Sequence, residues 1–324
     1  MPYYPGNKPD PSGEKQRKTA AAVKRNRLLR LSAAVLLFLL VLYGAIRLSL
    51  YQSELNDSKK TAAELRQIQN QEEIKAESAD YPVPKETVTA AAVSSVPAAA
   101  PIPSPDTFSD RLAAVAYPDN PERRVSERFL ELRKKGKYII GWLSFDEVDE
   151  AVCQKDNTYF LNHDAIGKRN SNGAIFLDSG VSLMTRPYTL CLYGHNMKSG
   201  NMFGRLRKYK ESEYFYKHRM ISFDSIYEDG QYAVFAVMEM ETVPGTARWY
   251  DLWSLATDSY TKREEAIRTL EKRSLISGVL DVRADDQILL LVTCLDGNTE
   301  RLVVAARRLR DNETANTLTL RQEQ

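Results

Sequence analysis

The feature that most constrains this chain is a run of residues without a charge, LSAAVLLFLLVLYGAI at positions 31–46. Leucines flank the run on both sides, and the long side chains of Arg30 and Arg47 can reach the polar surface of a bilayer from its two ends. We therefore predict one membrane-spanning helix over residues 28–50. A cleaved secretory signal is the alternative, but the apolar core is long for a signal and no convincing cleavage site precedes Arg47.

Charge on the two sides of this run predicts the topology. Residues 1–50 hold nine Lys and Arg against two acidic residues, and nearly all of the basic ones precede the run. Such an excess keeps the N-terminal side in the cytoplasm, so the rest of the chain is expected outside the cell, at its membrane. Residues 51–324 carry 36 basic and 41 acidic residues, a net charge of −5, which does not favour nucleic acid as a partner.

Composition divides the chain into five parts. Residues 1–27 are polar and basic and are expected to form a cytoplasmic tail before the anchor at 28–50. Residues 51–119 are expected to form an extracellular stalk and linker, helical at first but poor in apolar residues, then rich in Pro and Ala, which cannot form a packed core. We expect the folded domain at 120–312 and a C-terminal tail at 313–324.

Most of the folded part reads as strand. Apolar runs separated by Gly, Asn and Asp predict seven strands, at 138–145, 158–161, 174–178, 189–193, 232–240, 287–293 and 301–309. Seven short strands with a minority of helix predict a mainly β barrel or sandwich.

Two short helices are predicted beside these strands. The first begins at Asn120 as its N-cap and stops at Gly136. The second begins at a capping box formed by Thr261 and Glu264 and runs to about Arg273. Their apolar faces comprise Val125, Phe129 and Leu132 in the first, and Ala266, Ile267 and Leu270 in the second.

The last two predicted strands place a thiol opposite a guanidinium. If they pair as a hairpin, Cys294 ends one strand and Arg301 begins the other, and directly opposed alpha carbons lie about 4.5 to 5.5 Å apart. A nearby guanidinium favours the thiolate and supplies hydrogen-bond donors to an oxyanion. A buried structural cysteine and a solvated arginine are the alternatives. The position at a strand end, beside Asp296, favours chemistry over packing.

A cysteine nucleophile usually needs a histidine, and the chain has three. His195 directly follows the strand predicted at 189–193 and opens a Gly-containing loop, so it is the favoured partner. His163 also follows a predicted strand, but its setting suits a local turn hydrogen bond equally well. His218 lies in a helix-like polar segment.

The other two cysteines and the common sequence motifs do not indicate a further site. Three cysteines in an exported chain cannot all pair within one molecule, and the apolar surroundings of Cys153 and Cys191 predict buried packing residues. The sequence contains no CxxC, HxxxH or HExxH spacing, so no metal site has local support, and GxSxG and Walker-type loops are absent as well.

Several blocks in order resemble the class B sortases. They are IIGWLSF (139–145), CQKDNTYFLNHDAIGKRNSNGAIFLD (153–178), LYGHNMKSGNMFGRLRKY (192–209), Thr293-Cys294 and RLVVAARRL (301–309), so that the resemblance covers roughly 120–312. It implies a closed eight-stranded β-barrel with N-terminal helices and a helix before the cysteine strand. It also implies cysteine transpeptidation at the outer face of a Gram-positive membrane, without a cofactor.

The resemblance implies a role for each matching residue. Cys294 would be the nucleophile, His195 the general acid and base, and Arg301 the oxyanion and substrate stabiliser, with Thr293 and Asp296 as supporting residues. The implied substrates are an LPXTG-like or NPXTX-like sorting signal and an amine of a cell-wall precursor or a pilin-type protein. The usual TLxTC reads Leu-Leu-Val-Thr-Cys at 290–294, a departure that bears on substrate preference.

Two rival functions remain open at this point. An exported cysteine peptidase would give the acyl group to water, and a catalytically idle, membrane-anchored binding module would form no acyl-enzyme at all.

Overall fold

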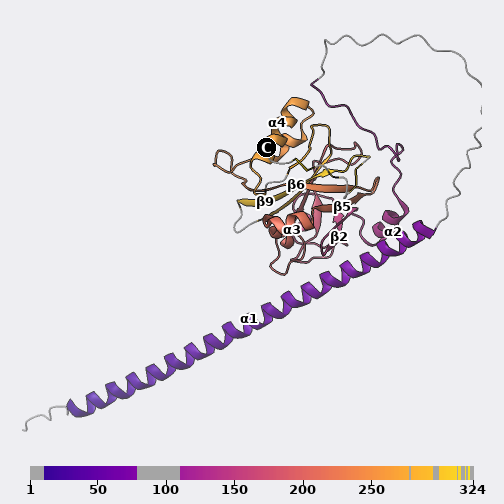
Figure 1. The fold of residues 1–324 in the computed structure, drawn as a ribbon. Helices are drawn as coiled ribbons and strands as arrows, with labels where there is room; N and C mark the ends of the chain where they lie inside the picture. Colours follow the sequence, from indigo (N-terminus) through magenta and orange to yellow (C-terminus); the bar gives the residue numbers. More distant parts are fainter. Residues whose placement is uncertain are drawn as a thin grey trace, which may run out of the picture. The chain divides into compact units, whose positions relative to one another are not determined.

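The computed structural model describes residues 11–78, 110–276, 279–294, 299–311, 313–314, 318 and 320–321 (Figure 1). The chain divides into two compact units, Met1–Asn56 and Asp57–Gln324, and the long helix α1, Pro11–Ser78, crosses the boundary between them. In the first unit, the side chains at 26–50 are all exposed, including large apolar ones such as Phe38. Asn26–Lys75 contains a window long and apolar enough to span a membrane.

The second unit is built around a closed barrel of eight strands, in the order β1-β2-β3-β4-β8-β9-β6-β5. The β2–β3 and β4–β8 pairs are parallel, and the other six neighbouring pairs are antiparallel. This confirms the closed eight-stranded barrel. The strands are β1 Ile139–Phe145, β2 Val148–Cys153, β3 Ile175–Leu177, β4 Thr189–Gly194, β5 Met220–Ser225, β6 Gln231–Glu241, β8 Ile288–Cys294 and β9 Glu300–Arg308.

Strand β8 is buried on both faces of the barrel wall. Leu289 and Leu291 belong to the apolar cluster that fills the barrel, whereas Ile288, Leu290 and Val292 belong to a second cluster on the outer face. Side chains alternate along a strand, so a strand covered on both sides becomes one continuous apolar run. Burial on this scale stabilises the fold by roughly 1.5–3 kcal/mol for each large apolar side chain.

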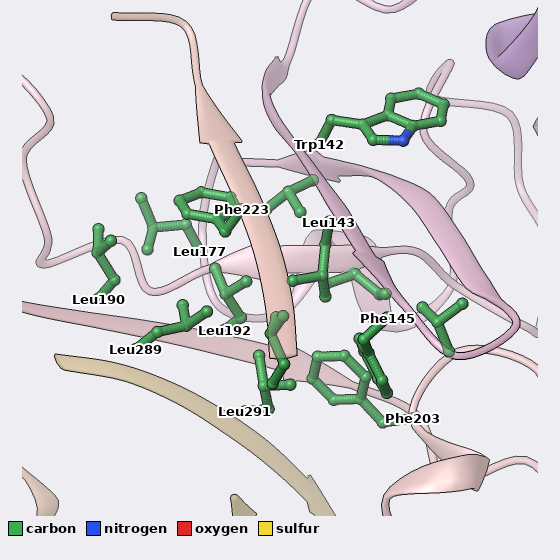
Figure 2. Close-up of a cluster of buried hydrophobic side chains, with 14 of the residues drawn as sticks. Trp142, Leu143, Phe145, Leu177, Leu190, Leu192, Phe203, Phe223, Leu289 and Leu291 are labelled. Atoms are coloured by element: carbon green, nitrogen blue, oxygen red, sulfur yellow. The ribbon is translucent and has the colours of Figure 1, made fainter. Parts of the chain in front are cut away.

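The interior cluster draws residues from strands that are far apart in the sequence. Figure 2 shows Leu143 of β1, Leu192 of β4, Phe223 of β5 and Leu289 and Leu291 of β8 converging on one another. The outer cluster is covered by helix α4, Tyr260–Lys272, whose buried residues include Ala266, Ile267 and Leu270 as expected. The wall that ends at Cys294 is therefore held from both sides.

The remaining elements are short. They are α2 Glu127–Lys135, η1 Tyr159–Leu161, η2 Gly204–Lys210, α3 Ser212–Lys217 and η3 Leu252–Ala256, together with a two-stranded sheet of β7 Val279–Leu280 and β10 Leu320–Arg321. Helix α2 buries Phe129 and Leu132 and ends before Gly136, as predicted. Part of 313–324, which was expected to be a tail, thus pairs with the main domain.

Both predicted helix starts were wrong. Asn120 closes a turn instead of capping a helix, because its side chain bonds to the N–H and the carbonyl of Arg124, each at 2.8 Å, and α2 begins after Ser126. Helix α4 is capped by Ser259, whose hydroxyl accepts from the N–H of Lys262, and not by Thr261.

One predicted strand was also wrong, and two strands of the barrel were missed, as were the two short strands β7 and β10. The run at 158–161 forms η1, because the carboxylate of Asp156 accepts hydrogen bonds from the N–H groups of Thr158 and Tyr159 and turns the chain. Strands β2 and β5 carry half-exposed polar residues between their buried ones, so neither showed a long apolar run.

The part of α1 that belongs to the second unit packs on the barrel. Leu65 is buried in the interior cluster, although this segment was expected to be a stalk without a core. Next to it, Arg66 donates from Nε to the carbonyl of Asp149 at 2.7 Å and from Nη2 to Glu150 at 3.1 Å. Residues 57–78 are therefore a helix docked on strand β2.

Candidate active site

The barrel brings three predicted site residues to neighbouring strand ends. In the parallel pair β4–β8, Gly194 lies beside Thr293, so the next residues along each strand are His195 and Cys294. In the antiparallel pair β8–β9, Cys294 lies directly opposite Arg301, as the hairpin predicted. The order of strands therefore sets histidine, cysteine and arginine positions side by side.

Strand alternation also puts these three positions on one face. Cys191, Val292 and Val303 belong to the outer cluster, and His195, Cys294 and Arg301 are an even number of residues from them along β4, β8 and β9. These three positions form a row at the edge of the outer face, just past the last residues of the outer cluster.

Thr293 ties the two parallel strands together immediately before this row. Its hydroxyl donates to the carbonyl of Gly194 at 2.7 Å, and its side chain is 1% exposed. A buried hydrogen bond of this kind contributes about 1 kcal/mol net and costs more when one partner is left alone. Thr293 thus fixes the register between the strand ends that carry His195 and Cys294.

The ring of His195 is held by backbone from another part of the barrel. Its Nε2 lies 2.8 Å from the carbonyl oxygen of Leu161, at the end of η1. A carbonyl only accepts, so Nε2 carries the hydrogen and Nδ1 is the nitrogen left for proton transfer. Backbone N–H groups of Met197 and Phe203 both donate to the carbonyl of His195 and close the following loop against it.

Two glycines make room for this histidine. Gly173 has φ +64°, and a Cβ there would lie 2.3 Å from the carbonyl oxygen of Phe160 and 3.1 Å from Cδ2 of His195. At Gly194 a Cβ would lie 2.9 Å from the ring of Phe203, which is fully buried under the loop. Side chains at these positions would displace the histidine or the loop that holds it.

Arg301 sits in the middle of the strand end. Besides Cys294, its other strand neighbour is Met240 of β6, and its Nη1 donates to the carbonyl of Glu300 at 2.9 Å. The backbone of Arg301 therefore lies between the cysteine strand β8 and strand β6. Asp296, predicted as a supporting residue, lies outside the described residues.

Comparison with known proteins identifies the family of this chain. The sequence model of the sortase domain matches residues 146–309, which span β2 to β9. The chain belongs to the sortase family. Sortase B of Listeria monocytogenes is 29% identical over 180 residues, which are 54% of this chain and 70% of that protein.

Solved sortase B structures share the fold. The Staphylococcus aureus sortase B–substrate complex superposes with a TM-score of 0.51 at 26% identity, covering 59% of this sortase and 88% of that chain. A sortase B complexed with triglycine gives the same TM-score and identity, over 59% of this sortase and 89% of that chain. The predicted class B resemblance is confirmed, and this sortase is a cysteine transpeptidase.

The other histidines of this sortase make local contacts. His163 Nδ1 lies 2.8 Å from the carbonyl oxygen of Tyr159, and the two rings stack with centroids 4.0 Å apart. His218 follows α3, stacks on Tyr214 and lies 3.6 Å from Asp146. Both are engaged away from the cysteine strand, whereas His195 adjoins it.

The other two cysteines of this sortase are buried free thiols, as predicted. Cys153 belongs to the interior cluster and Cys191 to the outer one, so they face opposite sides of the barrel wall. Burial raises the pKa of the Cys191 thiol to about 12 and that of the Cys153 thiol further still. Neither thiol is suited to act as a nucleophile.

Sequence reasoning missed the residues that support the histidine of this sortase. Gly173 and the carbonyl of Leu161 act through contacts between segments that the sequence separates, and neither belongs to a catalytic residue type. The one available signal was the glycine just before the strand at 174–178, which marks a close backbone approach or a turn.

Proposed function

We propose that this sortase cleaves an LPXTG-like or NPXTX-like sorting signal through a thioester and transfers the protein to an amine of the cell wall or of a pilin-type protein. The observation that carries the proposal is the row of positions 195, 294 and 301 on one face of three adjacent strands. A row of base, nucleophile and oxyanion donor is what acyl transfer to and from a thiol requires.

In the first step, the thiolate of Cys294 attacks the carbonyl carbon of the threonine in the signal. The electron pair of the carbonyl moves to oxygen, and the guanidinium of Arg301 stabilises that oxyanion. The intermediate collapses as the carbon–nitrogen bond breaks, and Nδ1 of His195 gives its proton to the departing amine. The products are a thioester on Cys294 and the released C-terminal fragment.

In the second step, an amine attacks the same carbonyl carbon. His195 accepts the proton that the amine loses, the carbon–sulfur bond breaks, and the thiolate of Cys294 is restored. A sortase B bound to substrate and a sortase B bound to triglycine support a signal peptide and a short glycine amine as the two partners. Supporting roles for Thr293 and Asp296 belong to this proposal.

The proposal includes the membrane. Residues 28–50 anchor the chain, residues 1–27 stay in the cytoplasm, and residues 51–119 connect the anchor to an extracellular catalytic domain at 120–312, followed by 313–324. The exposed apolar surface of α1 within Asn26–Lys75 supports the anchor, and the basic residues before it support the orientation. The enzyme would then meet its substrates at the outer face of the membrane.

Product analysis tests the proposal. The full-length protein in detergent is incubated with labelled peptides of the two signal patterns, with and without triglycine. Transfer predicts a product lengthened by triglycine for at least one pattern. Hydrolysed peptide alone at every triglycine concentration would instead support a cysteine peptidase, and unchanged peptides throughout would contradict the proposal.

A further inference from the structure

Two glutamates oppose each other beside Arg301. Glu241, the last residue of β6, is the direct strand partner of Glu300, the first residue of β9. Like charges placed directly opposite in an antiparallel pair destabilise it. This pairing is one residue from Arg301, and it forms the end of the sheet that carries the candidate site.

Arg248 bridges these two carboxylates. Its guanidinium lies 3.0 Å from Glu241 and also pairs with Glu300, and it lies 3.7 Å from Glu239. Hydrogen bonds to Glu300 and Glu241 raise the pKa of Arg248, while a hydrogen bond from Thr246 and then the guanidinium of Arg248 lower the pKa of Glu241. One cation, at partly exposed side chains, therefore offsets the repulsion between the two carboxylates across the strand end.

The loop that carries Arg248 folds back onto the same strand end. The N–H of Glu241 donates to the carbonyl of Arg248 at 3.1 Å, and the N–H of Thr242 donates to the carbonyl of Thr299 at 2.8 Å. Gly245, with φ +87°, makes the turn that reverses the chain. Backbone and side chain of the loop thus close together on the end of the β6–β9 pair.

We propose that Arg248 is a positioning residue for Arg301, an inference that rests on the role proposed above for Arg301. While β9 is paired up to Glu300, alternation keeps the side chains of Glu300 and Arg301 on opposite faces. Without Arg248, the carboxylates of Glu241 and Glu300 repel each other and the end of the β6–β9 pair opens. The side chains of Glu300 and Arg301 are then no longer held on opposite faces of the strand. The guanidinium of Arg301 can then turn to the carboxylates and away from the thioester-forming carbonyl.

Kinetics on the full-length protein in detergent test this inference. With peptides of the two signal patterns and triglycine, Arg248→Ala is expected to lower kcat about tenfold or more with little change in KM, since the oxyanion forms only after binding. Adding Glu241→Gln to Arg248→Ala is expected to restore most of the lost kcat, because the like-charge pair of Glu241 and Glu300 is then gone. Arg268→Ala is the matched control, since Arg268 is also an exposed arginine paired with a glutamate, Glu264, on α4.

Hydrogen exchange supplies a readout that does not depend on activity. Faster exchange of the amides at 299–302 is expected in Arg248→Ala, and a return to the original rate in the double variant. The inference is overturned if Arg248→Ala behaves like Arg268→Ala, or if Glu241→Gln restores neither kcat nor protection. If the unaltered enzyme transfers no peptide to triglycine, the proposed function is refuted. The hydrogen-exchange data would still show whether Arg248 holds the strand end.

Discussion

At the scale of single residues, the site depends on close contacts as much as on the reacting groups. Cys294 and Arg301 could be paired from the sequence, because a hairpin with a short turn fixes which residues oppose each other. His195, the favoured histidine, also follows the end of β4, beside the end of the cysteine strand β8. The supporting contacts could not be predicted, because they join η1, Gly173 two residues before β3, and His195 after β4 only in the folded barrel.

Thr293→Val is expected to lower kcat while KM changes little. The variant keeps the shape of the buried side chain but removes the hydrogen bond to Gly194, at a cost of about 1–3 kcal/mol. Thr293→Ser keeps the hydroxyl and is the control. Steady-state kinetics on both variants check this, and an unimpaired Thr293→Val enzyme would show that the bond does not hold the register of the site.

Gly173→Ala is expected to reduce transfer by about tenfold or more, because the new methyl group would lie against the Phe160 carbonyl and the His195 ring. Gly167→Ala separates backbone strain from crowding, since Gly167 also has positive φ, +85°, but its nearest neighbour is a hydroxyl 3.4 Å away. Both variants should lose roughly 1–3 kcal/mol of stability. Equal kcat in the two would argue against a crowded histidine.

At the scale of elements, apolar runs predicted the strands that are buried on both faces and missed those that are not. Strands β4, β6, β8 and β9 were read correctly for this reason, and the candidate site lies at the ends of β4, β8 and β9. Helix starts failed, because α2 begins without a side-chain cap and part of the cap of α4 comes from a distant segment. Asp110, far from α4 in the sequence, accepts hydrogen bonds from Ser259 and Thr261 and so helps to close its start.

The docking of α1 on the barrel is expected to depend on pH. Burial raises the pKa of Glu150 from 4.5 to about 7, although Arg66 beside it acts in the opposite direction. If the helix leaves, the carboxyl returns toward its usual pKa, so the docked state binds more protons between these values. Docking should therefore weaken as pH rises from about 4.5 to 7.

Hydrogen exchange of residues 57–75 in the full-length protein, corrected for intrinsic rates, measures this dependence. Protection should fall across that pH interval, and Glu150→Gln should remove the change because the amide does not titrate. Protection that is the same at both ends of the interval in the unaltered protein would show that Glu150 does not govern docking.

At the scale of the whole molecule, composition predicted an exported domain on a membrane anchor, and the strand count predicted a β-barrel or sandwich. The resemblance to class B sortases supplied the eighth strand and the closure, which the apolar pattern alone did not give. The segment predicted to be a stalk also contributes Leu65 to the core, with Ile68 packed beside it, because sparse apolar residues in a polar helix give only a weak periodic signal.

The anchor makes its own prediction. Leu36→Arg together with Leu40→Arg, near the centre of 28–50, should release the protein from membranes into alkaline carbonate washes, since each buried arginine costs about 2.5–3.5 kcal/mol. Leu48→Arg is the control, because an arginine near the end of the span can reach the interface. If the doubly substituted protein stays in the membrane pellet, residues 28–50 are not the anchor.

The most direct test of the central claim is to locate the acyl group. The full-length protein is trapped with signal peptides in the absence of an amine, digested at low pH, and mapped by mass spectrometry. The account predicts a thioester on Cys294 and none on Cys153 or Cys191, which are buried thiols with raised pKa values and serve as internal controls. An adduct on either of those two, or a Cys294→Ala protein that still transfers peptide to triglycine, would contradict the account.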